Sequence, residues 1–127
     1  MKRISRALVI GSTALAFGSG DALAGYPGDI TGRWIALLNQ TLVTIRITSQ
    51  IDAGKCKTIT GRLAGDDIQG FYCPATGRIF FLRNYPTTGR TSQAYTGNLA
   101  ENGATNRMGG TFADMSRSGE FAWSASK

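Results

Sequence analysis

The residue types that carry most protein chemistry are scarce in this chain. None of its 127 residues is histidine and two are cysteine, so neither a Ser-His-Asp nor a Cys-His arrangement can form. Adjacent Asp66 and Asp67 fit a solvated hairpin turn better than a shared catalytic or metal site. The sequence therefore predicts no enzyme, no metal site and no cofactor. Seven carboxylates follow residue 24, most of them in or beside predicted turns: Asp29, Asp52, Asp66, Asp67, Glu101, Asp114 and Glu120.

The two cysteines predict one structural disulfide. Cys56 and Cys73 are 17 residues apart, and the chain contains no Cys-x-x-Cys redox motif. Closing a loop of this size stabilises a protein by roughly 3 kcal/mol in the chain-entropy model. Because a domain of this size commonly has a stability of only about 5–15 kcal/mol, the disulfide is expected to supply a large share.

The amino terminus has the pattern of a secretory signal peptide. Lys2, Arg3 and Arg6 precede an apolar run at 7–17, and the small residues Ala22 and Ala24 mark a cleavage site. This apolar run is shorter than the about 20 residues that span a bilayer. We expect a signal peptide at 1–24, a single domain at 25–127 that does not span a membrane, and a secreted or periplasmic location.

The charge of the predicted mature chain is moderate. Removing residues 1–24 takes away three of the 14 basic and one of the 8 acidic residues, which leaves a formal charge of +4. The remaining basic residues are spread along the chain, whereas a nucleic-acid-binding protein is expected to show a basic stripe or a known motif. We therefore expect no nucleic-acid partner. The basicity favours solubility and attraction to anionic components of the envelope.

Hydrophobic residues alternate with a period of two, which predicts β-strands separated by short turns. Connections this short cannot hold parallel crossovers, so each strand is expected to pair antiparallel with the next. The turns carry Asn, Asp, Ser or Gly at 38–41, 65–67, 74–77, 101–103 and 116–119. The eight predicted strands are 30–37, 42–48, 57–64, 68–73, 78–83, 92–100, 107–113 and 120–126.

Glycines inside the predicted strands favour a closed barrel. Glycine weakens a strand but lets a sharply coiled strand bend without a side-chain clash. The fold class we predict is all-β, an eight-stranded antiparallel up-and-down β-barrel. The alternative is a β-sandwich in which these glycines form bulges. The glycines in question are Gly32, Gly61, Gly70, Gly97, Gly109 and Gly110.

Three short motifs resemble the avidin/streptavidin family and the wider calycin group of small β-barrels. They are Gly32-Arg33-Trp34, the Thr-Gly step in 59–63 and the second Thr-Gly step in 95–98. The strand layout matches over most of the mature chain, but only a few residues match in sequence. The resemblance implies an avidin-like or calycin-like barrel fold, which does not by itself imply a function. A non-catalytic binding function is expected because the residues for catalysis are missing. It does not extend to the biotin-contacting residues, because Ala36 stands where avidins have asparagine and Leu63 where they have tyrosine.

Two kinds of binding partner follow from this reading. The first is a small molecule held in the barrel mouth, and the second is an envelope protein such as a hydrolase, for example a protease or lysozyme, that the barrel would inhibit. Candidate contacts for the protein partner are Arg83, Tyr85 and Arg90 in the long polar connection at 83–91, because Tyr and Arg concentrate interface energy. For each candidate small-ligand contact taken singly, core packing is the favoured explanation, because large apolar side chains dominate cores. These candidates are Trp34, Phe81, Tyr95, Phe112 and Trp123.

Biotin is expected to bind weakly in spite of the resemblance. Ala36 and Leu63 remove two polar partners, and the late aspartate of the avidin site has no clear counterpart. Each unsatisfied buried polar group costs about 1–3 kcal/mol, so three would weaken binding by about 3–9 kcal/mol, which is two decades or more in affinity. Isothermal titration of the mature, disulfide-intact protein checks this, and a nanomolar dissociation constant would contradict it.

Overall fold

The structure, a computed structural model, describes residues 25–85, 91–101 and 106–127. Within these residues the fold is all-β, and no helix is long and apolar enough to cross a membrane. The predicted turn at 101–103 lies partly outside the described residues, and the predicted signal peptide at 1–24 lies wholly outside them. The eight strands are β1 (Gly32–Leu38), β2 (Thr41–Ala53), β3 (Cys56–Leu63), β4 (Asp66–Cys73), β5 (Arg78–Asn84), β6 (Thr91–Leu99), β7 (Arg107–Asp114) and β8 (Glu120–Ser126).

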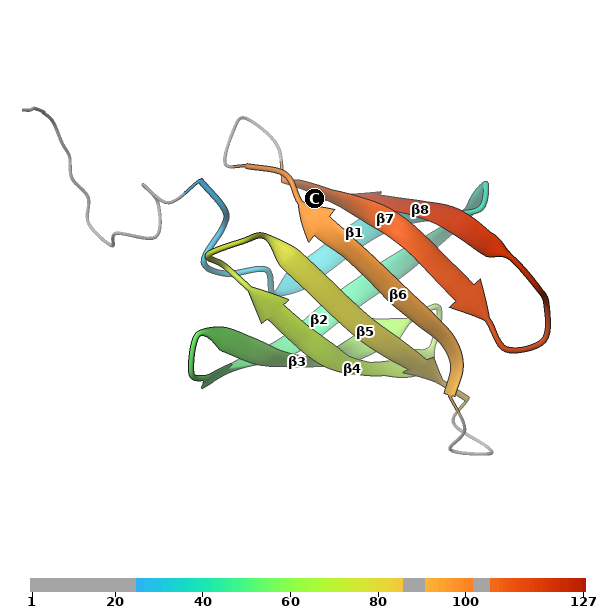
Figure 1. The fold of residues 1–127 in the computed structure, drawn as a ribbon, viewed down its shortest axis with the longest axis horizontal. Coiled ribbons are helices and arrows are strands. Elements are labelled where there is room, and N and C mark those ends of the chain that lie inside the picture. The colour runs from blue at the N-terminus through green and yellow to red at the C-terminus, as the bar shows by residue number, and fades with distance from the viewer. Residues whose placement is uncertain (1–24, 86–90, 102–105) are drawn as a thin grey trace, which may run out of the picture.

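The strands form one closed barrel in sequential order (Figure 1). Each strand pairs antiparallel with the next, and β8 returns to β1 through the register from Ile35 opposite Ser126 to Leu38 opposite Trp123. Closure leaves no free sheet edge, which removes a site for aggregation. The β-barrel prediction is confirmed, and the β-sandwich alternative is excluded. The N-terminal segment, blue in Figure 1, crosses the end of the barrel that carries the β4–β5 turn, while the β7–β8 turn lies at the other end.

Strand β2 is longer than the sequence pattern predicted. It continues to Ala53 instead of ending at Thr48, because the register shifts between Ile47 and Ser49. One extra residue at this bulge changes which residues of β2 point into the barrel, from odd-numbered ones before it to even-numbered ones after it. Ile47 and Gln50 therefore lie on the same, inward side of the strand. A bulge of this kind interrupts the period of two, which is why the pattern appeared to stop there.

The predicted disulfide is confirmed. Cys56 and Cys73 are bonded, with their Cα atoms 4.2 Å apart, and no free cysteine is present in the described residues. Cys56 begins β3 and Cys73 ends β4, so the bond joins the open end of a hairpin whose turn lies at Ala64 and Gly65. The bond therefore holds together the two strand ends that the turn does not connect.

Two glycines in this hairpin allow neighbouring strands to approach through their backbones. A Cβ atom added to Gly61 would lie 2.0 Å from the carbonyl oxygen of Arg46, and one added to Gly70 would lie 1.9 Å from that of Phe80. These contacts are with backbone atoms, which cannot move aside as a flexible side chain can. Any other residue would push the adjacent strand outward at the place where the sheet coils.

Replacing Gly70 with alanine is therefore expected to destabilise the barrel by more than about 2 kcal/mol, since overpacking against backbone costs about 1–3 kcal/mol or more. The control is Gly54→Ala, where the added Cβ meets nothing within 4 Å but the residue has a φ of +92°. That variant is expected to lose about 1–2 kcal/mol from backbone conformation alone. Urea unfolding of both variants gives the comparison, and equal losses would contradict the proposed collision.

Candidate functional site

The five aromatic residues predicted to bind a small ligand are all in the core of the barrel. Trp34, Phe81 and Tyr95 are fully buried, and Phe112 and Trp123 nearly so. Phe81, Tyr95 and Phe112 occupy one row of the register across β5, β6 and β7, and their rings stack at centroid distances of 4.7 and 4.8 Å. Their faces are thus taken up by one another. Their role in ligand binding stays a prediction.

Trp123 closes this aromatic cluster from β8. Its ring meets Phe81 and Tyr95 edge-on, at centroid distances of 5.7 and 5.9 Å. The neighbouring row holds Gly97 opposite Gly110, and a Cβ on Gly97 would lie 2.9 Å from the Trp123 ring. The indole N–H donates to the Thr96 carbonyl at 3.1 Å. The paired glycines therefore make the space that the tryptophan fills.

A polar network lies above the aromatic row, toward the end of the barrel with the β7–β8 turn. Arg83 donates from Nε to an Asp66 carboxylate oxygen at 2.8 Å and from a terminal nitrogen to the Gln93 side-chain oxygen at 2.9 Å. The Arg83 and Asp66 side chains are only 17% and 16% exposed. Gln93 also accepts from the Tyr95 hydroxyl at 2.6 Å and donates to Asp114 at 2.8 Å. One ion pair and several hydrogen bonds thus connect side chains of four strands, β4 to β7.

The two outer members of this network have shifted pKa values. Burial raises the pKa of the Tyr95 hydroxyl to about 12, so it remains a neutral donor. The pKa of Asp114 is lowered to about 2, chiefly because it accepts from the Ser116 hydroxyl and, further, from the Gln93 amide and the Ser116 backbone N–H. Asp114 forms no ion pair with another described residue. Among the described residues it is therefore an ionised carboxylate without a bonded cation, and the nearby charge of Arg117 contributes to the lowering of its pKa.

A surface cavity of about 290 Å³ opens beside Asp114. Tyr85 and Met115 form its rim and are 46% and 77% exposed. The Met115 backbone N–H donates to the Ser92 carbonyl at 2.9 Å, which fixes the β7–β8 turn against β6. The cavity combines an apolar rim, hydroxyl groups and one negative charge. Its lining residues are Tyr85, Thr91, Ser92, Asp114, Met115 and Ser116.

Two of the three residues predicted to contact a protein partner are among the described residues, and the structure separates these two. Tyr85 is on the rim of this cavity and is available at the surface. Arg83 points inward, where Asp66 and Gln93 take up its donors. Arg90 lies outside the described residues. Of the two described residues, Tyr85 has the exposed position that a contact residue needs.

The N-terminal segment closes the opposite end of the barrel. The Gln50 amide donates to the Gly28 carbonyl at 2.8 Å and accepts from the Ile30 N–H at 3.0 Å. The Trp34 indole donates to the Ile30 carbonyl at 3.0 Å, and the Tyr72 hydroxyl donates to the Pro27 carbonyl at 2.5 Å. Ile30 is fully buried as a result. Three residues of the segment, Pro27, Gly28 and Ile30, are thereby tied to the barrel.

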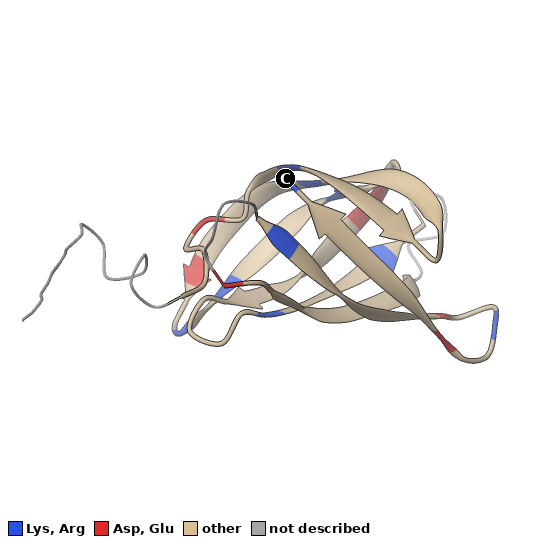
Figure 2. Cartoon of the chain, turned by 90° about the horizontal axis from the view of Figure 1, so that it is seen from above, with Lys and Arg blue, Asp and Glu red and all other residues tan. Residues whose placement is uncertain are grey.

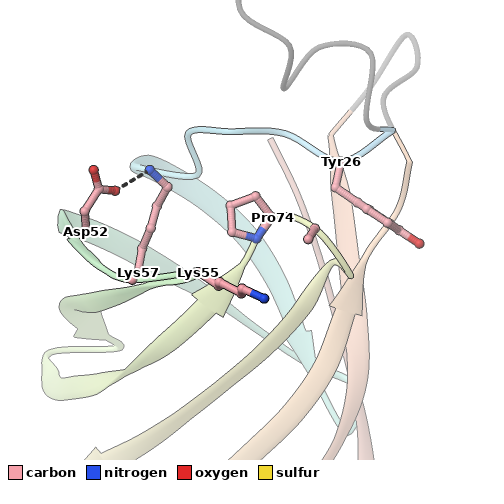
Figure 3. A pocket seen from close by; sticks show the side chains of 7 residues that line it. Tyr26, Asp52, Lys55, Lys57 and Pro74 are labelled. Atoms are coloured by element: carbon pink, nitrogen blue, oxygen red, sulfur yellow. Dashed lines mark hydrogen bonds and ion pairs between the residues drawn. The ribbon is translucent and has the colours of Figure 1, made fainter.

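A second cavity of about 290 Å³ lies between this segment and the disulfide (Figure 3). Lys57 forms an ion pair with Asp52 at 2.8 Å on one side, and Lys55 and Pro74 lie between this pair and Tyr26. Lys55 and Pro74 directly adjoin the bonded cysteines, which limits their movement. Gly77 lies against the Tyr26 ring, where a Cβ would come within 2.6 Å. This site is basic, with Lys55 and Lys57 against one carboxylate, Asp52.

The sequence did not predict that Gln50, Asp66, Gln93 and Asp114 form the hydrogen-bonded groups at the two ends of the barrel. For Gln93 and Asp114 a signal was present, because each is in phase with an inward aromatic, Tyr95 or Phe112, two residues away. Polar residues in phase with a core stripe at a strand end mark the rim of a barrel. Gln50 carried no such signal, because the bulge in β2 shifts its phase.

In comparisons with known proteins, no family model and no curated protein matches the chain. The eight-stranded antiparallel barrel agrees with a calycin-like architecture, and the closer likeness to avidins stays a prediction. Ala36 and Leu63 are both buried in the core. No group of three His, Cys, Asp or Glu side chains in the described part of the chain is placed to hold a metal ion.

The lowered pKa of Asp114 predicts part of the acid sensitivity of the fold. A carboxylate with a pKa below its unfolded value stabilises the protein above about pH 4, and this contribution is lost as the pH falls toward about 2. Ser116→Ala removes the largest cause and is expected to reduce the loss of unfolding free energy across this range. Urea unfolding at several pH values measures it. Ser118→Ala in the same turn is the control, and an unchanged slope in Ser116→Ala would contradict the assignment.

Proposed function

We propose that this chain is an exported, non-catalytic binding protein that recognises a protein partner at the barrel end carrying Tyr85, Asp114 and Met115. The observation that carries the proposal is the packing of the interior. The stacked aromatics Phe81, Tyr95 and Phe112 occupy the volume in which a barrel of this type would hold a small ligand. The paired side chains of Arg83 and Asp66 lie above them. Recognition at the outer rim of the barrel requires no rearrangement of this core.

The chemistry of the rim cavity favours a basic side chain of the partner. Asp114 is ionised through the whole physiological range and has no bonded cation among the described residues. The aliphatic part of a lysine or arginine can lie against Tyr85 and Met115 while its charge meets Asp114. Charge-assisted hydrogen bonds of this kind are about twice as strong as neutral ones. An envelope hydrolase inhibited by the insertion of this rim is one partner class that fits.

Rigidity of the rim supports the same function. The network from Asp66 through Arg83 and Gln93 fixes Asp114 in place, and the Met115-to-Ser92 backbone bond fixes the turn. A preformed contact surface loses less conformational entropy when it binds.

Met115→Lys is expected to weaken binding of the partner at least tenfold, because it places a positive charge beside Asp114 that repels the basic side chain of the partner. The partner is isolated with the tagged mature protein from its own envelope fraction and is identified as a stoichiometric protein by native mass spectrometry. Binding of the purified partner is then measured for both variants. The matched control is Ile51→Lys, which adds the same charge at an exposed apolar residue on β2 at the other end of the barrel. A retained stoichiometric small molecule in place of a protein, or equal losses in the two variants, would contradict the proposal.

A further inference from the structure

Three arginines lie side by side on the outer wall of the barrel. The register places Arg33 of β1 opposite Arg46 of β2, and Arg46 opposite Arg62 of β3. Directly opposed residues in antiparallel strands have Cβ atoms about 4.5–5.5 Å apart, and like charges at this distance repel. Figure 2 shows basic residues on several strands, and the register places these three in one row.

This row is neutralised at one end only. Arg62 forms an ion pair with Asp67 at 3.0 Å and donates to the Gly65 carbonyl at 3.0 Å. Arg33 and Arg46 are exposed, and within the described residues neither has an ion pair or a side-chain hydrogen bond. The fold gains nothing from placing them together. Two adjacent, unpartnered guanidinium groups form a surface suited to phosphate or carboxylate.

The same two strands carry an exposed apolar surface toward their shared turn. Leu37 of β1 is directly opposite Leu42 of β2, and Leu42 is 69% exposed. Ile35, also exposed, lies on β1 between Leu37 and Arg33. Each leucine is four residues from the arginine on its own strand, which is about 13 Å at 3.3 Å per residue. The wall of β1 and β2 is thus apolar near the turn and cationic farther from it.

A groove of about 350 Å³ continues this apolar surface across β8. Ile35, Leu37 and Leu42 form one side, small Ser124 and Ser126 lie on β8, and Arg107 of β7 stands at the far side. Arg107 is exposed and, like Arg33, has no ion pair with any described residue. Apolar side chains flanked on two sides by arginines match the layering of a bilayer surface, where acyl chains lie beneath anionic headgroups.

We propose that the outer wall formed by β1 and β2, together with the groove over β8, docks the protein on an anionic membrane surface. Leu37 and Leu42 enter the boundary between headgroups and acyl chains, and Arg33 and Arg46 contact lipid phosphates. An apolar face buried about 5–10 Å into this boundary is typical of interfacial binding. Arginines about 13 Å along the strand from the leucines then lie near the level of the headgroups, where their own side chains can contact phosphates. The membrane is bound at its surface and not crossed by this face.

The test is co-sedimentation of the mature protein with phosphatidylcholine vesicles, with and without about one third phosphatidylglycerol, at low salt. Binding is expected to the anionic vesicles, to be weak on phosphatidylcholine alone, and to fall as salt is raised. Each arginine near an anionic surface changes binding by about fivefold, so Arg46→Gln should lower the partition coefficient about fivefold and the double change with Arg33→Gln about 25-fold. Leu42→Asn should lower it about tenfold.

Matched controls separate this face from general electrostatic attraction. Arg78→Gln removes the same charge from an exposed position on β5, and Ile51→Asn removes an apolar side chain that is 63% exposed on the same strand as Leu42. Both controls are expected to bind nearly as well as the unchanged protein. Equal losses for Arg46→Gln and Arg78→Gln, or for Leu42→Asn and Ile51→Asn, would overturn the proposal. So would binding to soluble polyglutamate with no binding to anionic vesicles.

Discussion

The close approach of neighbouring strand backbones at four inward glycines is the constraint on which the rest of the barrel depends. At Gly61, Gly70, Gly97 and Gly110 a Cβ atom would lie within 2.3 Å of a carbonyl oxygen on the adjacent strand. Eight strands of these lengths close on themselves only if the sheet coils strongly, and strong coiling brings backbones together at some inward positions. Glycine is the residue that permits this contact. The aromatic row and the Trp123 ring then fill the interior that the coiling produces.

The architecture could be predicted from the sequence because its causes are local. Alternation of apolar residues, short turns and glycines inside strands are all readable along the chain, and so is the spacing of Cys56 and Cys73. The length of β2 could not be read, because the extra residue at the bulge reverses the phase of everything beyond Ile47. Gln50, which holds the N-terminal segment, was hidden for the same reason.

The surfaces proposed to bind partners depend on pairing between distant residues, which the sequence does not reveal. Arg33, Arg46 and Arg62 look dispersed along the chain, and only the register of three strands places them in one row. Likewise Asp66, Arg83 and Asp114 come from three hairpins and meet through Gln93 at the barrel end. The five aromatic candidates differ from these residues. They were conspicuous as candidates in the sequence, and the structure places them where they pack on one another.

The two proposed surfaces lie on the same end of the barrel, and this arrangement links them. The β1–β2 turn, next to Leu37 and Leu42, and the β7–β8 turn, which carries Met115, both lie opposite the end closed by the N-terminal segment. The Asn39 backbone N–H donates to the Ala122 carbonyl of β8 at 2.9 Å, so the first of these turns is fixed to the strand that follows the second. A barrel docked through the wall of β1 and β2 would hold the Asp114 cavity close to the lipid surface. Partners that are themselves on the membrane would then meet the cavity at a raised local concentration, which increases the apparent affinity without any new contact.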